Sequence, residues 1–175
     1  EFMHTVEAVP RENGRALASL SRTGVAVFPA DDAEHTPIWR ELSAGRQVMD
    51  FAFEPGVRAT VTGTARWVDA TSDQARPHWV IQMHTPAGSA EVSLHTAGEH
   101  NVRNALASAA AALGAGAPLS AVVQGLQDFV PVKGRSALMT LQRAGRTVTL
   151  IVDSYNANPD SVRAAIDMLA GLPGP

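Results

Sequence analysis

The spacing of apolar residues changes along this chain of 175 residues, and this change constrains the fold more than any other feature. Short continuous apolar runs at 24–28 and 47–53 are typical of strands buried in a parallel sheet. From 57 to 95, apolar and polar residues alternate, which indicates the half-exposed strands of an antiparallel meander. From 101 to 129 the apolar spacing becomes helical. This order predicts an α/β fold with a mixed sheet.

Helical signals also flank the parallel strands. Apolar side chains recur on roughly one face of 1–20, where Pro10 is expected to kink or restart the helix. A short helix is predicted at 36–42. Two further helices are predicted at 101–113 and 118–129, and residues that break helices follow each of them. The predicted sheet therefore has helices to cover it.

The C-terminal part of the sequence predicts a separate unit. Strands are expected at 137–141 and 147–152, followed by a polar loop and a helix at 159–169. About forty residues are too few to bury a core of their own. We therefore expect one domain over 1–134, the beginning of a second over 135–175, and a chain that is a segment of a larger protein.

Composition excludes several classes of function. The net charge of −3 argues against a partner that is nucleic acid or an anionic membrane, and no apolar run approaches the length of a membrane span. The absence of cysteine removes thiolate nucleophiles, disulfides and cysteine-bound zinc. The histidines other than His100 are scattered without metal-ligand spacing, so no metal ligand is predicted. The acidic pair Asp31 and Asp32 indicates a turn at the end of a strand. The single lysine, Lys133, is followed by Gly134 and cannot complete a G-x-x-x-x-G-K-[ST] phosphate loop.

The strongest local signal is the string D-S-Y-N-A-N-P at 153–159, which lies between a predicted strand and a predicted helix. In open α/β sheets, ligands bind in this kind of crevice, and the helix start attracts anions. Asp153 is placed to accept hydrogen bonds from sugar hydroxyls, while Asn156 and Asn158 both donate and accept. The alternative is that these residues only cap the helix and turn the chain. The clustering of polar residues favours a binding site.

A second signal is the string G-E-H-N-V-R-N at 98–104, at the start of the alanine-rich helix. Asn101 and Asn104 are three residues apart, so they lie nearly above one another on the first turn. Two carboxamides on one face can read the edge of a nucleobase. The alternative is that Asn101 is the N-cap and Asn104 is merely solvated. His100 is either a ligand or acid–base group, or a hydrogen-bonded structural residue.

A third signal is the loop P-V-K-G-R at 131–135, between the two expected domains. Arg135 follows a glycine, and its guanidinium can reach phosphate or ribose oxygens with several donors. The alternative is a hinge that carries two solvated cations. The sequence by itself does not separate these two interpretations.

Together, the strings at 98–107, 131–135 and 153–161 resemble the Mur ligases of peptidoglycan synthesis, and a weaker match at 24–32 extends the resemblance over nearly the whole chain. The resemblance implies a cytoplasmic, monomeric protein of three domains. This chain then corresponds to the later part of the central P-loop ATPase-type domain, followed by the start of a Rossmann-like C-terminal domain. The phosphate-binding loop precedes residue 1, so the segment alone is expected to be inactive.

The resemblance also implies an activity. Mur ligases use ATP and Mg²⁺ to activate a carboxylate as an acyl phosphate, which an amine attacks to form an amide. The string at 153–159, with G-x-H-N-x-x-N upstream, is typical of the member that joins D-alanyl-D-alanine to UDP-N-acetylmuramoyl-tripeptide. Two alternatives stay open. One is another Mur or folylpolyglutamate-type amino-acid ligase, and the other is a non-catalytic binding module that kept the fold.

The resemblance further implies roles for individual residues. Asn101 and Asn104 would lie at the adenine and nearby nucleotide atoms, Arg135 at ribose or phosphate, and Asp153 at the ribose hydroxyls. The residues implied to line the nucleotide–substrate cleft are His100, Ser154, Asn156 and Asn158. Many Mur ligases carry a carbamylated lysine that bridges magnesium, and the alignment places Asn13 there. This departure leaves no residue assigned as a metal ligand.

Overall fold

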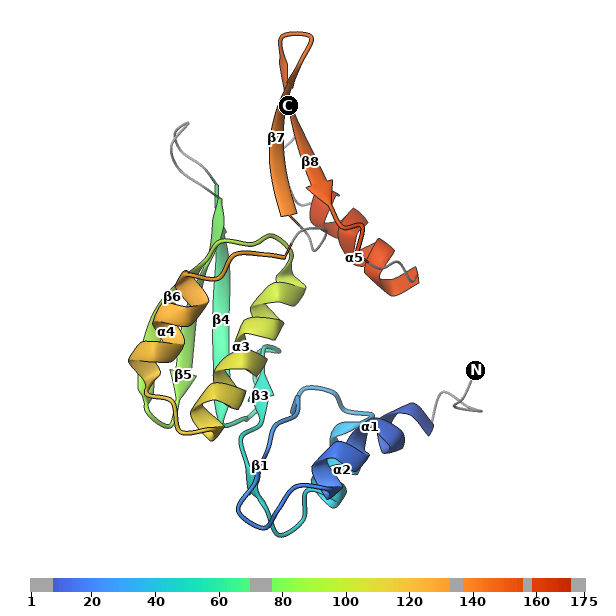
Figure 1. Ribbon diagram of the computed structural model, residues 1–175, viewed down its shortest axis with the longest axis vertical. Helices are drawn as coiled ribbons and strands as arrows, with labels where there is room; N and C mark the ends of the chain where they lie inside the picture. Colours follow the sequence, from blue (N-terminus) through green and yellow to red (C-terminus); the bar gives the residue numbers. More distant parts are fainter. Residues whose placement is uncertain (1–7, 70–76, 133–136, 156–158, 171–175) are drawn as a thin grey trace.

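The structure is a computed structural model that describes residues 8–69, 77–132, 137–155 and 159–170 (Figure 1). The helices and strands follow the order that the sequence predicts, except that two short strands form where one was expected at 47–53. In chain order the elements are α1 (Ala8–Ala18), β1 (Val25–Ala26), α2 (Thr36–Leu42), β2 (Gln47–Val48), β3 (Phe51–Ala52), β4 (Val61–Val68), β5 (His78–Thr85), β6 (Gly88–Leu94), α3 (Glu99–Gly114), α4 (Leu119–Gln127), β7 (Ala137–Arg143), β8 (Arg146–Val152) and α5 (Pro159–Ala170).

Parallel strands form one edge of the fold, as the continuous apolar runs predict. β1 pairs in parallel with β2, and β3 pairs in parallel with β4. Backbone hydrogen bonds also join the β1–β2 pair to the β3–β4 pair. The Phe51 N–H donates to the Phe28 carbonyl at 3.2 Å, and the Ala30 N–H donates to the Phe51 carbonyl at 2.7 Å. The chain after β1 therefore runs beside β3. Helix α2 makes the crossover between β1 and β2, as parallel strands require.

The antiparallel meander is confirmed as β4-β5-β6, and β3 extends the same sheet in the order β3-β4-β5-β6. One boundary differs from the prediction, since β4 begins at Val61 although the alternation begins at Val57. The Asp50 carboxylate explains the difference. Its Oδ1 accepts hydrogen bonds from the Thr60 N–H at 2.8 Å and from the Thr60 hydroxyl at 2.6 Å. This side chain takes the place of a strand partner, so the chain before Val61 alternates in polarity without joining the sheet.

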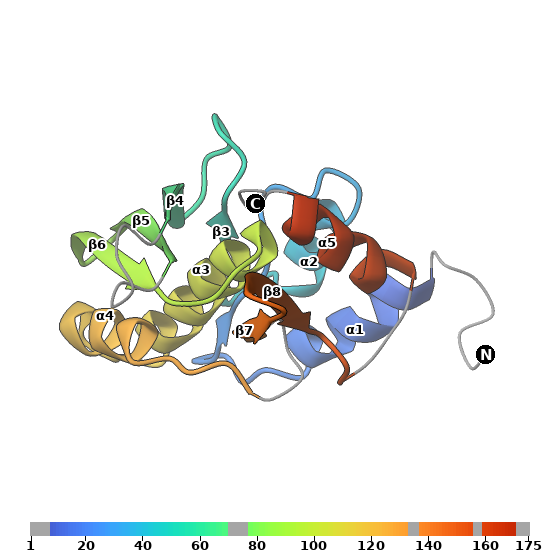
Figure 2. The same cartoon turned by 90° about the horizontal axis from the view of Figure 1, so that it is seen from above.

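Helices α3 and α4 pack on one face of the meander, where the main core lies (Figures 1 and 2). Small side chains on α3 let it approach the strands closely, and Gly63 on β4 serves the same purpose. A Cβ at Gly63 would lie 3.0 Å from Leu106 Cδ2 and 3.2 Å from the Gln82 carbonyl oxygen. The largest fully buried side chains of this core are Ile81, Met83, Leu106, Val61, Val92 and Val102.

Helices α1 and α2 pack against each other below the sheet in Figure 1. Pro10 lies in the first turn of α1, where its missing N–H removes no hydrogen bond within the helix. The Arg46 guanidinium joins the ends of both helices. Its Nη2 donates to the Ala18 carbonyl at 2.6 Å at the end of α1, and its Nη1 donates to the Leu42 carbonyl at 3.3 Å at the end of α2. An arginine thus satisfies carbonyls that helix ends leave without partners.

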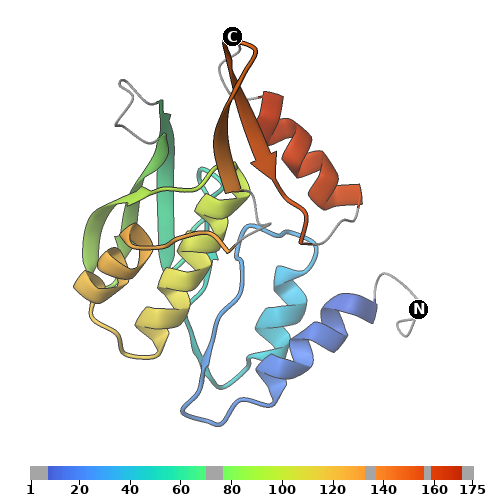
Figure 3. The same ribbon diagram turned by 45° about the horizontal axis from the view of Figure 1, so that its top comes forward.

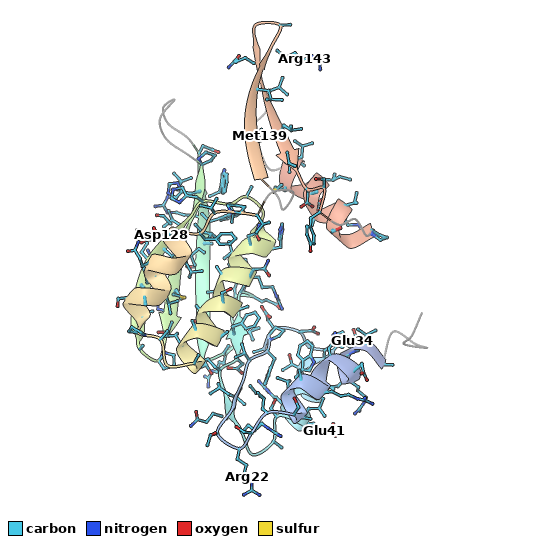
Figure 4. All side chains as sticks on the ribbon, viewed as in Figure 1. Arg22, Glu34, Glu41, Asp128, Met139 and Arg143 are labelled. Atoms are coloured by element: carbon cyan, nitrogen blue, oxygen red, sulfur yellow. The ribbon has the colours of Figure 1, made fainter. Side chains whose placement is uncertain are left out.

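Strands β7 and β8 form their own two-stranded sheet, and α5 lies beside it (Figures 1 and 3). The hairpin turn has positive φ at Ala144 (51°) and Gly145 (75°), which suits the twist of the paired strands. The register places Met139 opposite Leu150 on a face that also carries Leu141 and Val148. These four side chains are 41–49% exposed, and Figure 4 labels Met139 on this ribbon.

Candidate functional site

A cavity of about 630 Å³ lies where the start of α3, the loop after α4 and the loop after β8 come together. It contains four residues that the sequence nominated, namely His100, Asn101, Asn104 and Asp153. Figure 3 shows the β7–β8 hairpin near the N-terminal end of α3, which brings the two predicted units together. The remaining lining residues are Leu94, Thr96, Ala105, Ser108, Leu126, Phe129, Pro131, Val132, Tyr155, Ser161 and Ala164.

At the start of α3, Gly98 is the N-cap, which rules out the alternative that Asn101 has this role. Gly98 has φ of 86°, and a Cβ there would lie 2.5 Å from His100 Cε1. Glycine is therefore needed both for the backbone conformation and for the space that His100 occupies. The helix begins two residues earlier than predicted, so Asn101 lies inside its first turn.

Asn101 and Asn104 stand one above the other, as their spacing predicts. The Asn101 Nδ2 donates to the Ala97 carbonyl at 2.7 Å and to the Thr96 hydroxyl at 3.3 Å. The Asn104 Nδ2 donates to Asn101 Oδ1 at 3.3 Å. Asn101 is half-buried, whereas Asn104 is exposed. The Asn101 carboxamide is held by the chain before α3. The Asn104 carboxamide faces solvent at the cavity, where its donor and acceptor groups can meet a ligand.

The opposite wall comes from the loop after β8. Asp153 is half-buried in the cavity wall, and the side chain of Tyr155 is 64% exposed beside it. Ser154 is exposed between them and does not line the cavity. The candidates Arg135, Asn156 and Asn158 lie outside the described residues. The carboxylate and the carboxamides thus face one cavity from chain segments about fifty residues apart, as a bipartite site requires.

Sequence reasoning assigned no role to several residues that line the cavity. Tyr155 stands inside the nominated polar string, so its position carried a signal that was not used. Phe129 lies just after α4, inside the range 118–129 for which a helix is predicted, and a residue expected in a helix gives no signal of a binding role. Thr96 is buried and orients Asn101, but a single threonine after a strand gives no sequence signal.

A smaller cavity of about 390 Å³ shares His100 and Ala164 with the first. Its walls include Trp67 and Trp79, whose rings meet edge to face at 5.3 Å between centroids. The two tryptophans stand opposite one another on β4 and β5, so their side chains share one face of the sheet.

One carboxyl group outside the cavities has a shifted pKa. Burial raises the pKa of Asp32. Hydrogen bonds from the side chain and backbone of His35, together with the charge of His35, lower the pKa by more than burial raises it, so the net shift is downward. The His35 Nδ1 lies 3.0 Å from Asp32 Oδ2. The two residues directly precede α2, of which His35 is the N-cap, and neither lines either cavity.

In the part of the chain that the structure describes, no three His, Cys, Asp or Glu side chains gather in a way that would hold a metal ion. None of the helices described there combines the length and apolar character that crossing a bilayer takes. His84 and His95, at the two ends of the β5–β6 hairpin, are exposed.

The mixed sheet, its covering helices and the polar cavity at the start of a helix define an α/β protein with a candidate ligand site between two units. Residues 1–112 match the Mur ligase middle domain. The chain belongs to the Mur ligase family.

Relatives support this assignment over nearly the whole chain. UDP-N-acetylmuramoyl-tripeptide–D-alanyl-D-alanine ligase of Escherichia coli (strain K12) is 34% identical over 174 residues, which cover 99% of this chain and 36% of the relative. The ligase of the same name from Haemophilus influenzae is 32% identical over 171 residues, covering 98% of this chain and 34% of the relative. The chain therefore spans about a third of the length of these relatives.

Solved structures agree with the fold. A crystal structure of MurF from Acinetobacter baumannii superposes with a TM-score of 0.81 at 34% identity, covering 98% of this chain and 35% of that protein. MurF ligase from Thermotoga maritima in complex with ADP has a TM-score of 0.76 at 19% identity, covering 99% of this chain and 37% of that protein. At that identity the second likeness shows the fold alone.

Proposed function

We propose that this chain is part of an ATP-dependent ligase that joins D-alanyl-D-alanine to UDP-N-acetylmuramoyl-tripeptide in the cytoplasm, as a monomer. Support comes from the relatives of that name and from the strings at 98–104 and 153–159. In the proposed reaction, the terminal phosphate of ATP passes to the tripeptide carboxylate, which gives an acyl phosphate and ADP. The amine of D-alanyl-D-alanine then attacks the acyl carbon and releases phosphate as the amide forms.

The 630 Å³ cavity is proposed as the adenosine end of the ATP site. Its size suits a ligand of this kind. The carboxamides of Asn101 and Asn104 would meet the base edge, and Asp153 would accept from the ribose hydroxyls. Arg135 is proposed to contact ribose or phosphate. The residues proposed to line the adjoining nucleotide–substrate cleft are His100, Ser154, Asn156 and Asn158.

We include Mg²⁺ in the proposal because Mur ligases use it together with ATP. When bound, it would neutralise charge on the transferred phosphoryl group. Among the residues that the structure describes, no cluster of carboxylates and histidines fits such an ion, so no step is assigned to it here. Asn13, which aligns with the metal-bridging lysine of many Mur ligases, is exposed on α1. An amide there would not form the carbamate that bridges magnesium in those relatives.

We also propose that residues 1–134 are the later part of the central domain and that residues 135–175 begin the C-terminal domain. The separate β7–β8 sheet supports this division. The exposed apolar face of β7–β8 supports it too, because a complete domain seldom leaves such a face to solvent. On α5, Val162, Ile166 and Leu169 are 47–60% exposed at helical spacing.

The observation that carries the proposal is the meeting of the α3 carboxamides with Asp153 across one cavity. The test measures phosphate release by the full-length protein. We expect release from ATP only when both UDP-N-acetylmuramoyl-tripeptide and D-alanyl-D-alanine are present. Turnover with a different amino acid or dipeptide would favour another ligase of the family. ADP binding without turnover under any of these conditions would favour a non-catalytic binding module.

A further inference from the structure

The Asp31 carboxylate is the most enclosed charged group that the structure records in an ion pair, with 0% of its side chain exposed. The Arg103 guanidinium binds it through two nitrogens, with Nη1 3.0 Å from Oδ2 and Nη2 2.5 Å from Oδ1. The backbone N–H groups of Phe53 and Glu54 donate to Oδ2 at 2.8 and 3.1 Å. Four donors therefore surround one buried carboxylate, which offsets the cost of removing its charge from water.

This pair joins three segments of the fold. Asp31 follows the strand residues beside β3, and Phe53 and Glu54 directly follow β3 itself. Arg103 stands in α3, 72 residues away along the chain. The contact therefore ties the carboxyl ends of two parallel strands to the first turns of the helix that carries Asn101 and Asn104.

The position of Arg103 on α3 determines what the pair can do. The buried side of α3, which includes Val102 and Leu106, faces the sheet. Arg103 lies about 200° round the helix from Asn101, so the two residues flank this buried side in opposite directions. Apolar contacts are non-directional and leave a helix free to roll or slide by small amounts. The bidentate contact of Arg103 with Asp31 restricts this motion on one side of α3. It thereby fixes the direction in which the side that carries Asn101 points.

We propose that the Asp31–Arg103 pair, named here the anchor, is a positioning device that holds the carboxamides of α3 in register with a bound nucleobase. This proposal rests on the proposed nucleotide site. Neither anchor residue lines the cavity, so the anchor acts through Asn101 and Asn104 and not by touching the ligand. Loss of the anchor is expected to change how well the site distinguishes one base from another.

The experiment uses the full-length protein with Arg103→Leu, and measures the dissociation constants of ATP and GTP together with thermal unfolding. We expect ATP binding to weaken about tenfold, and the preference for ATP over GTP to fall. A side chain that only stabilises the fold would lower the unfolding temperature and leave the base preference unchanged. Arg103→Lys keeps the charge but cannot bind through two nitrogens, so it is expected to give an intermediate affinity and preference.

The matched control is Arg22→Leu, which removes an exposed arginine at the far end of the molecule from the cavity (Figure 4). It should bind both nucleotides like the wild type. Asn104→Ala is measured alongside as a direct test of the cavity. A wild type that binds no adenine nucleotide overturns both the proposed function and the anchor. Weakened binding in Asn104→Ala, with unchanged affinity and preference in folded Arg103→Leu, overturns the anchor alone.

Discussion

Gly98 shows how a single residue sets the geometry of the cavity. Its φ of 86° and the nearby His100 ring exclude a side chain. We expect Gly98→Ala to lower the free energy of unfolding by about 1–3 kcal/mol, because an L-residue is strained in this backbone region. Urea unfolding of the full-length protein measures the loss. His100 would also be displaced, so nucleotide affinity should fall with stability.

Gly125 provides the matched control for this change. It lies within α4, and a Cβ there would meet no atom within 4 Å. Gly125→Ala should be neutral, or stabilise by up to about 1 kcal/mol, since alanine favours the helix. Equal losses in the two variants would contradict the special role of Gly98.

The Asp32–His35 pair predicts a pH dependence of stability. The pKa of Asp32 is lowered in the folded protein, because hydrogen bonds and the charge of His35 outweigh burial. A lowered pKa means that the unfolded chain binds the proton more readily. The stabilisation is thus present above the ordinary aspartate pKa of about 3.9 and is lost as the pH falls through the lower, folded value.

The measurement compares the unfolding free energy of the wild type and of Asp32→Asn from about pH 6 down to pH 3. The wild type should be the more stable near pH 6, and the difference should shrink below about pH 4. A difference that stays constant over this range would show that Asp32 does not titrate as described.

At the scale of elements, the approach of α3 to the meander depends on Gly63. The Leu106 side chain and the Gln82 carbonyl leave little room for a side chain there. We expect Gly63→Ala to destabilise the fold by about 1–3 kcal/mol, because overpacking forces the helix or the strand to move. Thermal or urea unfolding tests this, with Thr64→Ala on the exposed face of the same strand as control. Similar stability in wild type and Gly63→Ala would mean that α3 can shift without cost.

Periodicity predicted the type of nearly every element, while boundaries depended on contacts that a local pattern does not contain. Helix α2 and the meander follow from spacing and breakers, which act between near neighbours. The start of β4 was predicted wrongly because Asp50 captures Thr60 before the ladder begins. The start of α3 was predicted two residues too late, because the N-cap is Gly98, where the backbone turns, and not Asn101.

At the scale of the whole molecule, the two units meet at the candidate nucleotide cavity. Asp153 comes from one unit and Asn104 from the other. We expect Asp153→Ala in the full-length protein to raise the Michaelis constant for ATP about tenfold, since it removes an acceptor for the ribose. Steady-state phosphate release at varied ATP measures this effect. The Michaelis constant for D-alanyl-D-alanine serves as the internal control, and an unchanged constant for ATP in a folded variant would contradict the assignment.

Two further comparisons extend this prediction. Arg135→Ala is expected to act in the same direction, because a guanidinium at ribose or phosphate binds the ground state of the nucleotide.

Combining Asp153→Ala with Asn104→Ala tests whether the two units hold one ligand. Effects that add within error would indicate independent contacts, and strong non-additivity would indicate that the units close on the nucleotide together.

The amino-acid sequence by itself determined which segments become helices or strands, and it nominated four of the polar residues that line the cavity. These properties follow from local spacing and from residue types that favour caps, turns and strand ends. Only the tertiary structure decided that Asp31 binds Arg103, that Thr96 orients Asn101, and that Tyr155 faces the same cavity as Asp153. The first of these contacts joins residues 72 positions apart along the chain, and the other two depend on where the packed backbone places the start of α3 and the loop after β8. Their partners are chosen by where the packed backbone brings each side chain, and residue spacing carries no record of that choice.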